Sequence, residues 1–125
     1  MKLRAPRNRT ITLTAEDQSL YKRRLLRLSE PLLIESLTDK TICQNVFEAI
    51  PFLPDGFVDL MIVDPPYNLD KTFNDSKFKS LPSAEYVEWI DRWLSGLRRT
   101  LKPTASIYIC SDWRSSAAVQ QVAEK

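Results

Sequence analysis

The chain has 125 residues, of which 43% are hydrophobic and 27% charged, and its formal net charge is +2. This length allows at most one domain, and the composition is that of an ordinary globular protein. No histidine is present to join the two cysteines in a Cys/His metal site, and no apolar run reaches membrane-spanning length. We therefore expect a cytoplasmic protein without a metal site of that kind.

Basic residues crowd the N-terminal part of the chain. Residues 1–13 have no helical period and predict an extended arm. Thr14 is a suitable N-cap for a helix that we expect to run to about Leu28. The basic residues of this part are Lys2, Arg4, Arg7, Arg9, Lys22, Arg23, Arg24 and Arg27. They suit contact with nucleic-acid phosphates, although a solvated tail and helix face explain them equally well.

Short apolar segments separated by turn residues follow. Thr41–Gln44 predicts a strand, and Val46–Ile50 predicts a short helix that ends at a proline. Pro54-Asp55-Gly56 predicts a turn. Phe57–Val63 is apolar except at one aspartate, which is typical of a central strand in a parallel sheet.

The C-terminal half continues the alternation. Residues 68–82 are polar and predict a long loop, of the kind that is usually functional or disordered. Ser83 is a suitable N-cap for a helix from Ala84 to about Leu101, whose apolar residues fall at helical spacing. Ser106–Cys110 predicts a further apolar strand, and Arg114–Lys125 predicts a last helix.

The order of these elements predicts an α/β fold with a parallel sheet and right-handed crossovers. Within this fold, Trp89 and Trp93 lie on the apolar face of their helix, so we expect them in the core rather than stacked on a ligand. Cys43 and Cys110 lie in apolar strand-like segments, so we expect buried, reduced thiols.

The most informative segment is Asp64-Pro65-Pro66-Tyr67, which directly follows the predicted strand ending at Val63. In open α/β sheets, ligands bind beyond the carboxyl ends of the strands. A carboxylate, two rigid prolines and an aromatic ring at this place suit a flat ring that bears an amino group. A strand-ending turn without a ligand is the alternative. Ser111-Asp112-Trp113-Arg114 follows the next predicted strand and either lines the same crevice or only caps the structure.

This segment and its surroundings resemble the DNA amino-methyltransferases, which move a methyl group from S-adenosylmethionine to the exocyclic amine of adenine or cytosine. The other matching segments are Arg7–Thr14, Leu53–Asp59, Leu101–Pro103 and Ile107–Arg114. The resemblance implies a partial, incomplete Rossmann-like fold. In that fold, residues 1–35 form the basic arm and helix, and residues 36–125 form the N-terminal part of the catalytic domain.

The resemblance also implies how a target base would be held. The carboxylate of Asp64 and the carbonyl of Pro65 would accept hydrogen bonds from the amine of a base flipped out of the duplex. The fixed φ angle of Pro65 would stiffen this corner, and Pro66 belongs to the same catalytic tetrapeptide. Tyr67 would stack on the base, in a contact worth roughly 1–3 kcal/mol. The acidic form of the tetrapeptide favours adenine N6 over cytosine N4.

The remaining implied roles concern the cofactor and the DNA. The cofactor would be S-adenosylmethionine, contacted by Asp64 and by Asn45. DNA would be the partner, with Lys71, Arg7 and Arg9 near its phosphates. Asparagine stands at position 45 where the family often has an acidic residue, so a charge beside the cofactor is lost.

Two segments of the family have no counterpart in this sequence. One is the Phe-x-Gly-x-Gly cofactor loop, since the only glycines are Gly56 and Gly96, and the other is the region that reads the DNA sequence. The chain is then a fragment, a truncated reading frame, or half of a split enzyme whose second chain carries both parts. We expect the isolated chain to be inactive.

Two other functions are open at this point. RNA amino-methyltransferases carry related tetrapeptides, although the basic arm and the flanking matches favour DNA. An inactive, truncated remnant would bind nucleic acid weakly through the basic arm, or would only fold in part.

Overall fold

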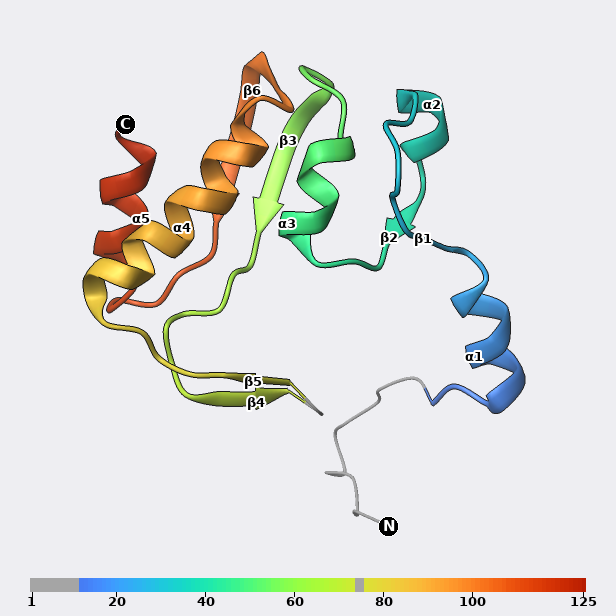
Figure 1. The fold of residues 1–125 in the computed structure, drawn as a ribbon, viewed down its shortest axis with the longest axis horizontal. Coiled ribbons are helices and arrows are strands. Elements are labelled where there is room, and N and C mark those ends of the chain that lie inside the picture. The colour runs from blue at the N-terminus through green and yellow to red at the C-terminus, as the bar shows by residue number, and fades with distance from the viewer. Residues whose placement is uncertain (1–11, 74–75) are drawn as a thin grey trace.

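The fold combines short helices with pairs of parallel strands (Figure 1). The computed structural model describes residues 12–73 and 76–125. Two of its strand pairs are parallel, which confirms the predicted α/β class. None of the helices within these residues is long and apolar enough to cross a membrane.

The N-terminal helix α1 (Ala15–Lys22) begins at a capping box. The Thr14 hydroxyl accepts from the Asp17 amide at 3.1 Å, and the Asp17 carboxylate accepts from the Thr14 amide at 3.0 Å. The helix ends at Lys22, so the predicted extension to Leu28 is wrong. The chain instead forms strand β1 (Leu25–Leu26), which pairs in parallel with β2 (Thr41–Ile42).

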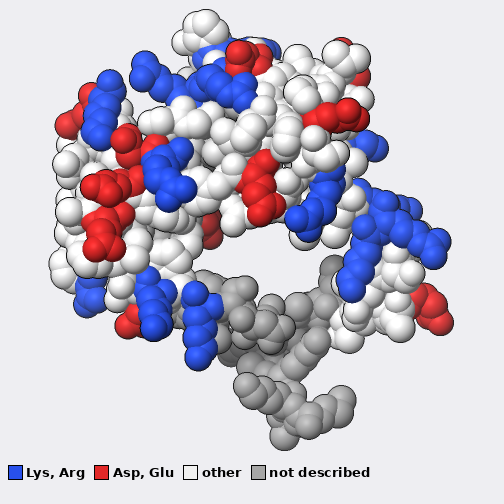
Figure 2. All heavy atoms as spheres, in the orientation of Figure 1, with Lys and Arg blue, Asp and Glu red and all other residues white. Residues whose placement is uncertain are grey.

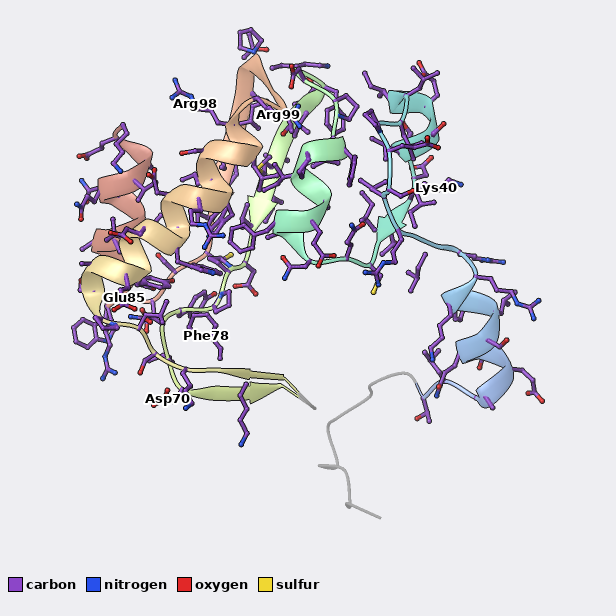
Figure 3. All side chains as sticks on the ribbon, in the orientation of Figure 1. Lys40, Asp70, Phe78, Glu85, Arg98 and Arg99 are labelled. Atoms are coloured by element: carbon purple, nitrogen blue, oxygen red, sulfur yellow. The ribbon has the colours of Figure 1, made fainter. Side chains whose placement is uncertain are left out.

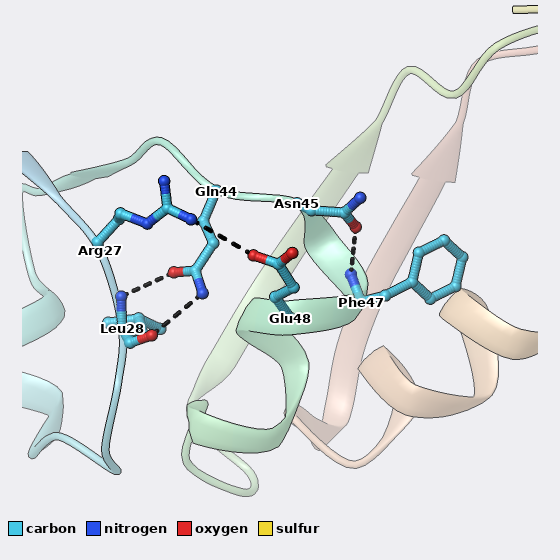
Figure 4. Close-up of polar contacts among 6 residues, drawn as sticks. All are labelled: Arg27, Leu28, Gln44, Asn45, Phe47 and Glu48. Carbon is cyan, nitrogen blue, oxygen red and sulfur yellow. Dashed lines mark hydrogen bonds and ion pairs between the residues drawn. The ribbon is translucent and has the colours of Figure 1, made fainter.

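The side chain of Gln44, which follows β2, joins that segment to the one that follows β1 (Figure 4). Its amide accepts from the Leu28 N–H at 2.7 Å and donates to the Leu28 carbonyl at 3.1 Å. Leu28 is only 3% exposed. Its backbone N–H and C=O are therefore both paired with a side chain 16 positions away rather than within a helix.

Short helices occupy the connections. They are α2 (Ile34–Leu37), α3 (Val46–Ala49) and the 3₁₀ turn η1 (Ile50–Phe52). The short helix predicted over Val46–Ile50 is confirmed by α3, which ends one residue earlier, at Ala49. Pro51 lies inside the 3₁₀ turn that follows it.

Strands β3 (Val58–Val63) and β6 (Leu101–Ile109) form the second parallel pair, in which Met61 faces Ile107 and Val63 faces Ile109. Between them runs helix α4 (Ser83–Arg98), and α5 (Ser116–Ala123) follows. The two helices lie next to each other (Figure 1) and share the core. The predicted cap at Ser83 is wrong, since the helix is preceded by Pro82 without a side-chain cap.

The buried core lies between α4, α5 and one face of the β3–β6 pair. Its members are Tyr86, Ile90, Trp93, Leu94, Ala118 and Val122. Trp93 is 2% exposed, as predicted for a core residue. Trp89 is half-buried and packs against Trp93 with its ring edge, and also against Phe47 of α3.

The opposite face of the β3–β6 pair is uncovered among the described residues. Leu60, Ile62 and Tyr108 are 54%, 70% and 64% exposed. Cys43 and Cys110 are also exposed, as free thiols, so the prediction of buried thiols is wrong. Each of these cysteines has its backbone N–H paired to a neighbouring strand, but neither side chain is covered.

The predicted loop 68–82 contains a hairpin of β4 (Lys71–Phe73) and β5 (Ser76–Phe78). The Asn68 amide closes its base by donating to the Leu81 carbonyl at 2.9 Å and accepting from the Leu81 N–H at 2.7 Å. Asp70 and Phe78 lie near this base, below the N-terminal end of α4 (Figure 3). Phe78 packs edge-on against Trp89 at 5.7 Å.

Candidate functional site

The segment Asp64–Tyr67 leaves the carboxyl end of β3 and forms a polar corner. Asp64 is exposed, Pro65 is buried, and Tyr67 is half-buried. The Tyr67 hydroxyl donates a hydrogen bond of 2.6 Å to one oxygen of the Asp64 carboxylate. This bond raises the pKa of Tyr67 to about 12, because it is lost when the phenol is deprotonated. At neutral pH the corner therefore presents a carboxylate beside a neutral phenol.

Helix α4 fixes the corner through a hydrogen bond from one of its buried side chains. The hydroxyl of Tyr86, which is 2% exposed, donates a hydrogen bond of 2.6 Å to the carbonyl of Pro66. Helical spacing in the sequence indicates only that Tyr86 lies on an apolar helix face and does not reveal this role. The available signal was its chemistry, since a buried tyrosine hydroxyl usually needs a hydrogen-bond partner.

The loop after β6 lies beside this corner. The Cys110 N–H donates to the Val63 carbonyl at 2.8 Å, which joins the carboxyl ends of the two strands. The charges of Cys110 and Asp112 add smaller contributions to the raised pKa of Tyr67. The structure thus brings together the two strand ends that the sequence placed at one crevice.

Asp112 acts as a structural cap within this loop. Its carboxylate accepts from the Ser115 hydroxyl at 2.7 Å, the Ser115 N–H at 2.8 Å and the Arg114 N–H at 3.0 Å. These bonds, first of all the one from the Ser115 hydroxyl, lower the pKa of Asp112. Trp113 is 81% exposed, and the Arg114 guanidinium lies 5.0 Å from its ring centre. Asp112 therefore caps this loop, and the lining of a ligand crevice by the same loop stays a prediction.

The other predicted site residues are not brought to this corner by any described contact. Asn45 caps α3, with its side-chain oxygen accepting from the Phe47 N–H at 3.0 Å (Figure 4). Lys71 begins β4, but its side chain lies outside the description, and Arg7 and Arg9 lie outside the described residues. Their contacts with the cofactor or DNA stay predictions.

Basic side chains gather at the C-terminal end of α1 (Figure 2). The exposed ones are Lys22, Arg23, Arg24 and Arg27. The Arg24 guanidinium lies 5.7 Å from the Tyr21 ring, and Arg27 forms an ion pair of 3.6 Å with Glu48. An exposed cationic surface of this kind suits phosphate contact.

Parallel strands joined by a helix, with polar loops at their carboxyl ends, are typical of α/β domains that bind ligands at that edge. The sequence profile of the DNA methylase family matches residues 58–125, from the start of β3 through α5. The chain therefore belongs to this family of N6/N4 DNA amino-methyltransferases, which confirms the resemblance inferred from the sequence.

Individual relatives match parts of the chain. Type II methyltransferase M.HpaI of Haemophilus parainfluenzae is 32% identical over 89 residues, which cover 71% of this chain and 28% of the relative. Type II methyltransferase M.BamHI of Bacillus amyloliquefaciens is 33% identical over 67 residues, or 54% and 15% of the two chains. DNA adenine methyltransferase YhdJ of Escherichia coli K12 is 33% identical over 57 residues, or 46% and 19%. The chain thus spans less than a third of each relative.

Proposed function

We propose that this chain holds the target base in an S-adenosylmethionine-dependent DNA methyltransferase that acts on the exocyclic amine of adenine. The observation that carries the proposal is the exposed Asp64 carboxylate at the end of β3, next to the rigid Pro65 and the ring of Tyr67. Membership of the DNA methylase family supports methyl transfer to DNA. The similarity to a relative named as a DNA adenine methyltransferase supports adenine over cytosine.

The chemistry follows from the weakness of the amine as a nucleophile. Its lone pair is delocalised into the ring, so it attacks poorly until the nitrogen becomes more tetrahedral. The Asp64 carboxylate and the Pro65 carbonyl would accept one hydrogen bond each from the two amine hydrogens. These bonds make the nitrogen more pyramidal, which localises its lone pair on the nitrogen, and they stabilise the positive charge that grows there. The base displaces the phenol of Tyr67 from Asp64 as it enters.

Neither glycine of this chain offers a backbone cradle for the methyl donor. A cofactor cradle made by backbone needs glycines in close approach. Gly56 faces open space, whereas a Cβ at Gly96 would lie 3.0 Å from the Ile50 side chain in the core. The donor would supply the electrophilic methyl group, but we derive no step through it from these residues.

We further propose that a second polypeptide, which carries the cofactor-binding and target-recognition parts, packs on the open side of the β3–β6 pair. Among the described strands, β3 pairs with β6 alone. Its apolar side chains Leu60 and Ile62 are 54% and 70% exposed. An exposed apolar surface of this kind is typical of a surface that packs against another polypeptide.

Replacing Ile62 with lysine should weaken association with this second polypeptide by about tenfold or more, since an ammonium group would then be buried. The measurement is a binding titration in which the part of M.HpaI outside the matched segment serves as the probe. Leu33→Lys is the control, because Leu33 is 75% exposed but lies away from the pair. The proposal is wrong if the unaltered chain does not bind, or if both substitutions weaken binding equally.

The base-binding proposal is tested with a single-stranded DNA oligonucleotide that carries the fluorescent adenine analogue 2-aminopurine. Stacking on Tyr67 should quench the fluorescence, and Tyr67→Ala should weaken this binding about tenfold. Tyr108→Ala is the matched control, because Tyr108 is 64% exposed on β6. Equal losses in the two variants would indicate unspecific stacking and refute the site. Stronger quenching with an RNA oligonucleotide of the same sequence would favour RNA as the substrate.

A further inference from the structure

We infer that Tyr86 is a positioning residue, which fixes the place of Tyr67 relative to Asp64 through its hydrogen bond to the Pro66 carbonyl. Only the expected effect of Tyr86 on binding of the target base rests on the proposed function. Tyr86 lies 20 positions from Pro66 along the chain. It therefore ties the corner to a different element, helix α4.

Between the Cα atoms of Asp64 and Tyr67, the covalent structure leaves one backbone rotation open. Asp64 and Pro65 each precede a proline, which restricts both of their ψ angles to extended values. The rings of Pro65 and Pro66 fix their own φ angles near −65°. The ψ angle of Pro66 has no such constraint, and this angle decides where the next residue, Tyr67, is placed.

The hydrogen bond from Tyr86 acts on this remaining rotation. The ψ angle of Pro66 turns the Pro66 carbonyl and the Tyr67 N–H together, because both belong to one planar peptide group. Holding the carbonyl oxygen 2.6 Å from the Tyr86 hydroxyl restricts this angle to a narrow range. This places the backbone of Tyr67 where its own hydroxyl reaches Asp64 at 2.6 Å.

Tyr86 is itself immobilised, so it can serve as the fixed end of this contact. It is 2% exposed, and its ring stacks on Trp89 with centres 5.8 Å apart and an angle of 12° between the planes. Burial raises the pKa of Tyr86, which keeps its hydroxyl protonated and able to donate. Beyond the corner, the two hydrogen bonds between Asn68 and Leu81 hold the other end of the segment.

Tyr86→Phe tests the inference, because it removes the hydroxyl and keeps the buried ring. In the 125-residue chain with ¹³C-labelled tyrosine, we expect the pKa of Tyr67 to fall from about 12 toward the ordinary value of about 10. The variant should also bind the 2-aminopurine oligonucleotide about twofold to tenfold more weakly, as expected for one lost hydrogen bond. In the unaltered chain, the Tyr86 hydroxyl proton should be protected from exchange with water.

Thr100→Val is the matched control. The Thr100 hydroxyl is also buried and donates to a backbone carbonyl, that of Leu97 at 2.7 Å, but at the opposite end of α4. Its loss should cost similar stability and leave the pKa of Tyr67 unchanged. An unchanged Tyr67 pKa in Tyr86→Phe, an equal change in Thr100→Val, or an unprotected Tyr86 hydroxyl would each overturn the inference.

Asp64→Ala separates this inference from the proposed function. If that substitution leaves oligonucleotide binding unchanged, the base-binding proposal fails. The titration of Tyr67 in Tyr86→Phe still decides whether Tyr86 positions the corner, since that measurement involves no nucleic acid.

Discussion

Asp64→Ala is expected to lower the rate of methyl transfer to DNA by about 10²–10³-fold, the range found when one group that stabilises developing charge is removed. The assay uses a chimera in which this chain replaces the matched 89-residue segment of M.HpaI. Radiolabelled S-adenosylmethionine supplies the methyl group, and label in the DNA is counted. Alanine cannot accept a hydrogen bond from the base amine, so the lone pair stays delocalised in the ring.

Asp59→Ala provides the control for this prediction. Asp59 is a second exposed carboxylate, which lies on strand β3 itself and forms an ion pair of 2.8 Å with Lys102. Exposed ion pairs contribute little to stability, so this variant should keep nearly full activity. Methyl transfer that survives Asp64→Ala, in a chimera that is active with Asp64 present, would refute the catalytic role.

The position of the site could be predicted from the sequence because it depends on local patterns. The apolar run that ends at Val63 marks strand β3, and Asp64 follows it directly. Helical spacing likewise placed Trp93 in the core. These features need only the strand and helix periods, which can be read within one segment.

The features that the sequence did not reveal depend on contacts between distant segments. Strand β1 exists because of its pairing with β2, and Leu28 is held by Gln44 rather than by a helix. The hairpin after the corner has three-residue strands, too short for a visible alternation, and is closed by Asn68 with Leu81. Such partners, 13 or 16 positions apart, are chosen by the tertiary structure and leave no local pattern.

Trp93→Ala should lower the free energy of unfolding by about 3–5 kcal/mol, because the substitution leaves a large cavity in the core. Trp93 is 2% exposed and packs among Ile90, Leu94 and Val122. Marginally stable domains have only about 5–15 kcal/mol in total. The measurement is urea unfolding followed by the fluorescence of the other two tryptophans, Trp89 and Trp113.

Trp93→Phe separates the contribution that the side-chain volume makes to stability from the effect of the buried Nε1–H. The Trp93 Nε1–H is buried and has no hydrogen-bond partner among the described residues. Phenylalanine removes this unsatisfied donor and fills most of the space, so we expect a loss of only about 1–2 kcal/mol. Equal losses in the two variants would mean that Nε1–H is hydrogen-bonded in solution. A loss below about 1 kcal/mol in Trp93→Ala would mean that the α4–α5 core does not carry the stability of the fold.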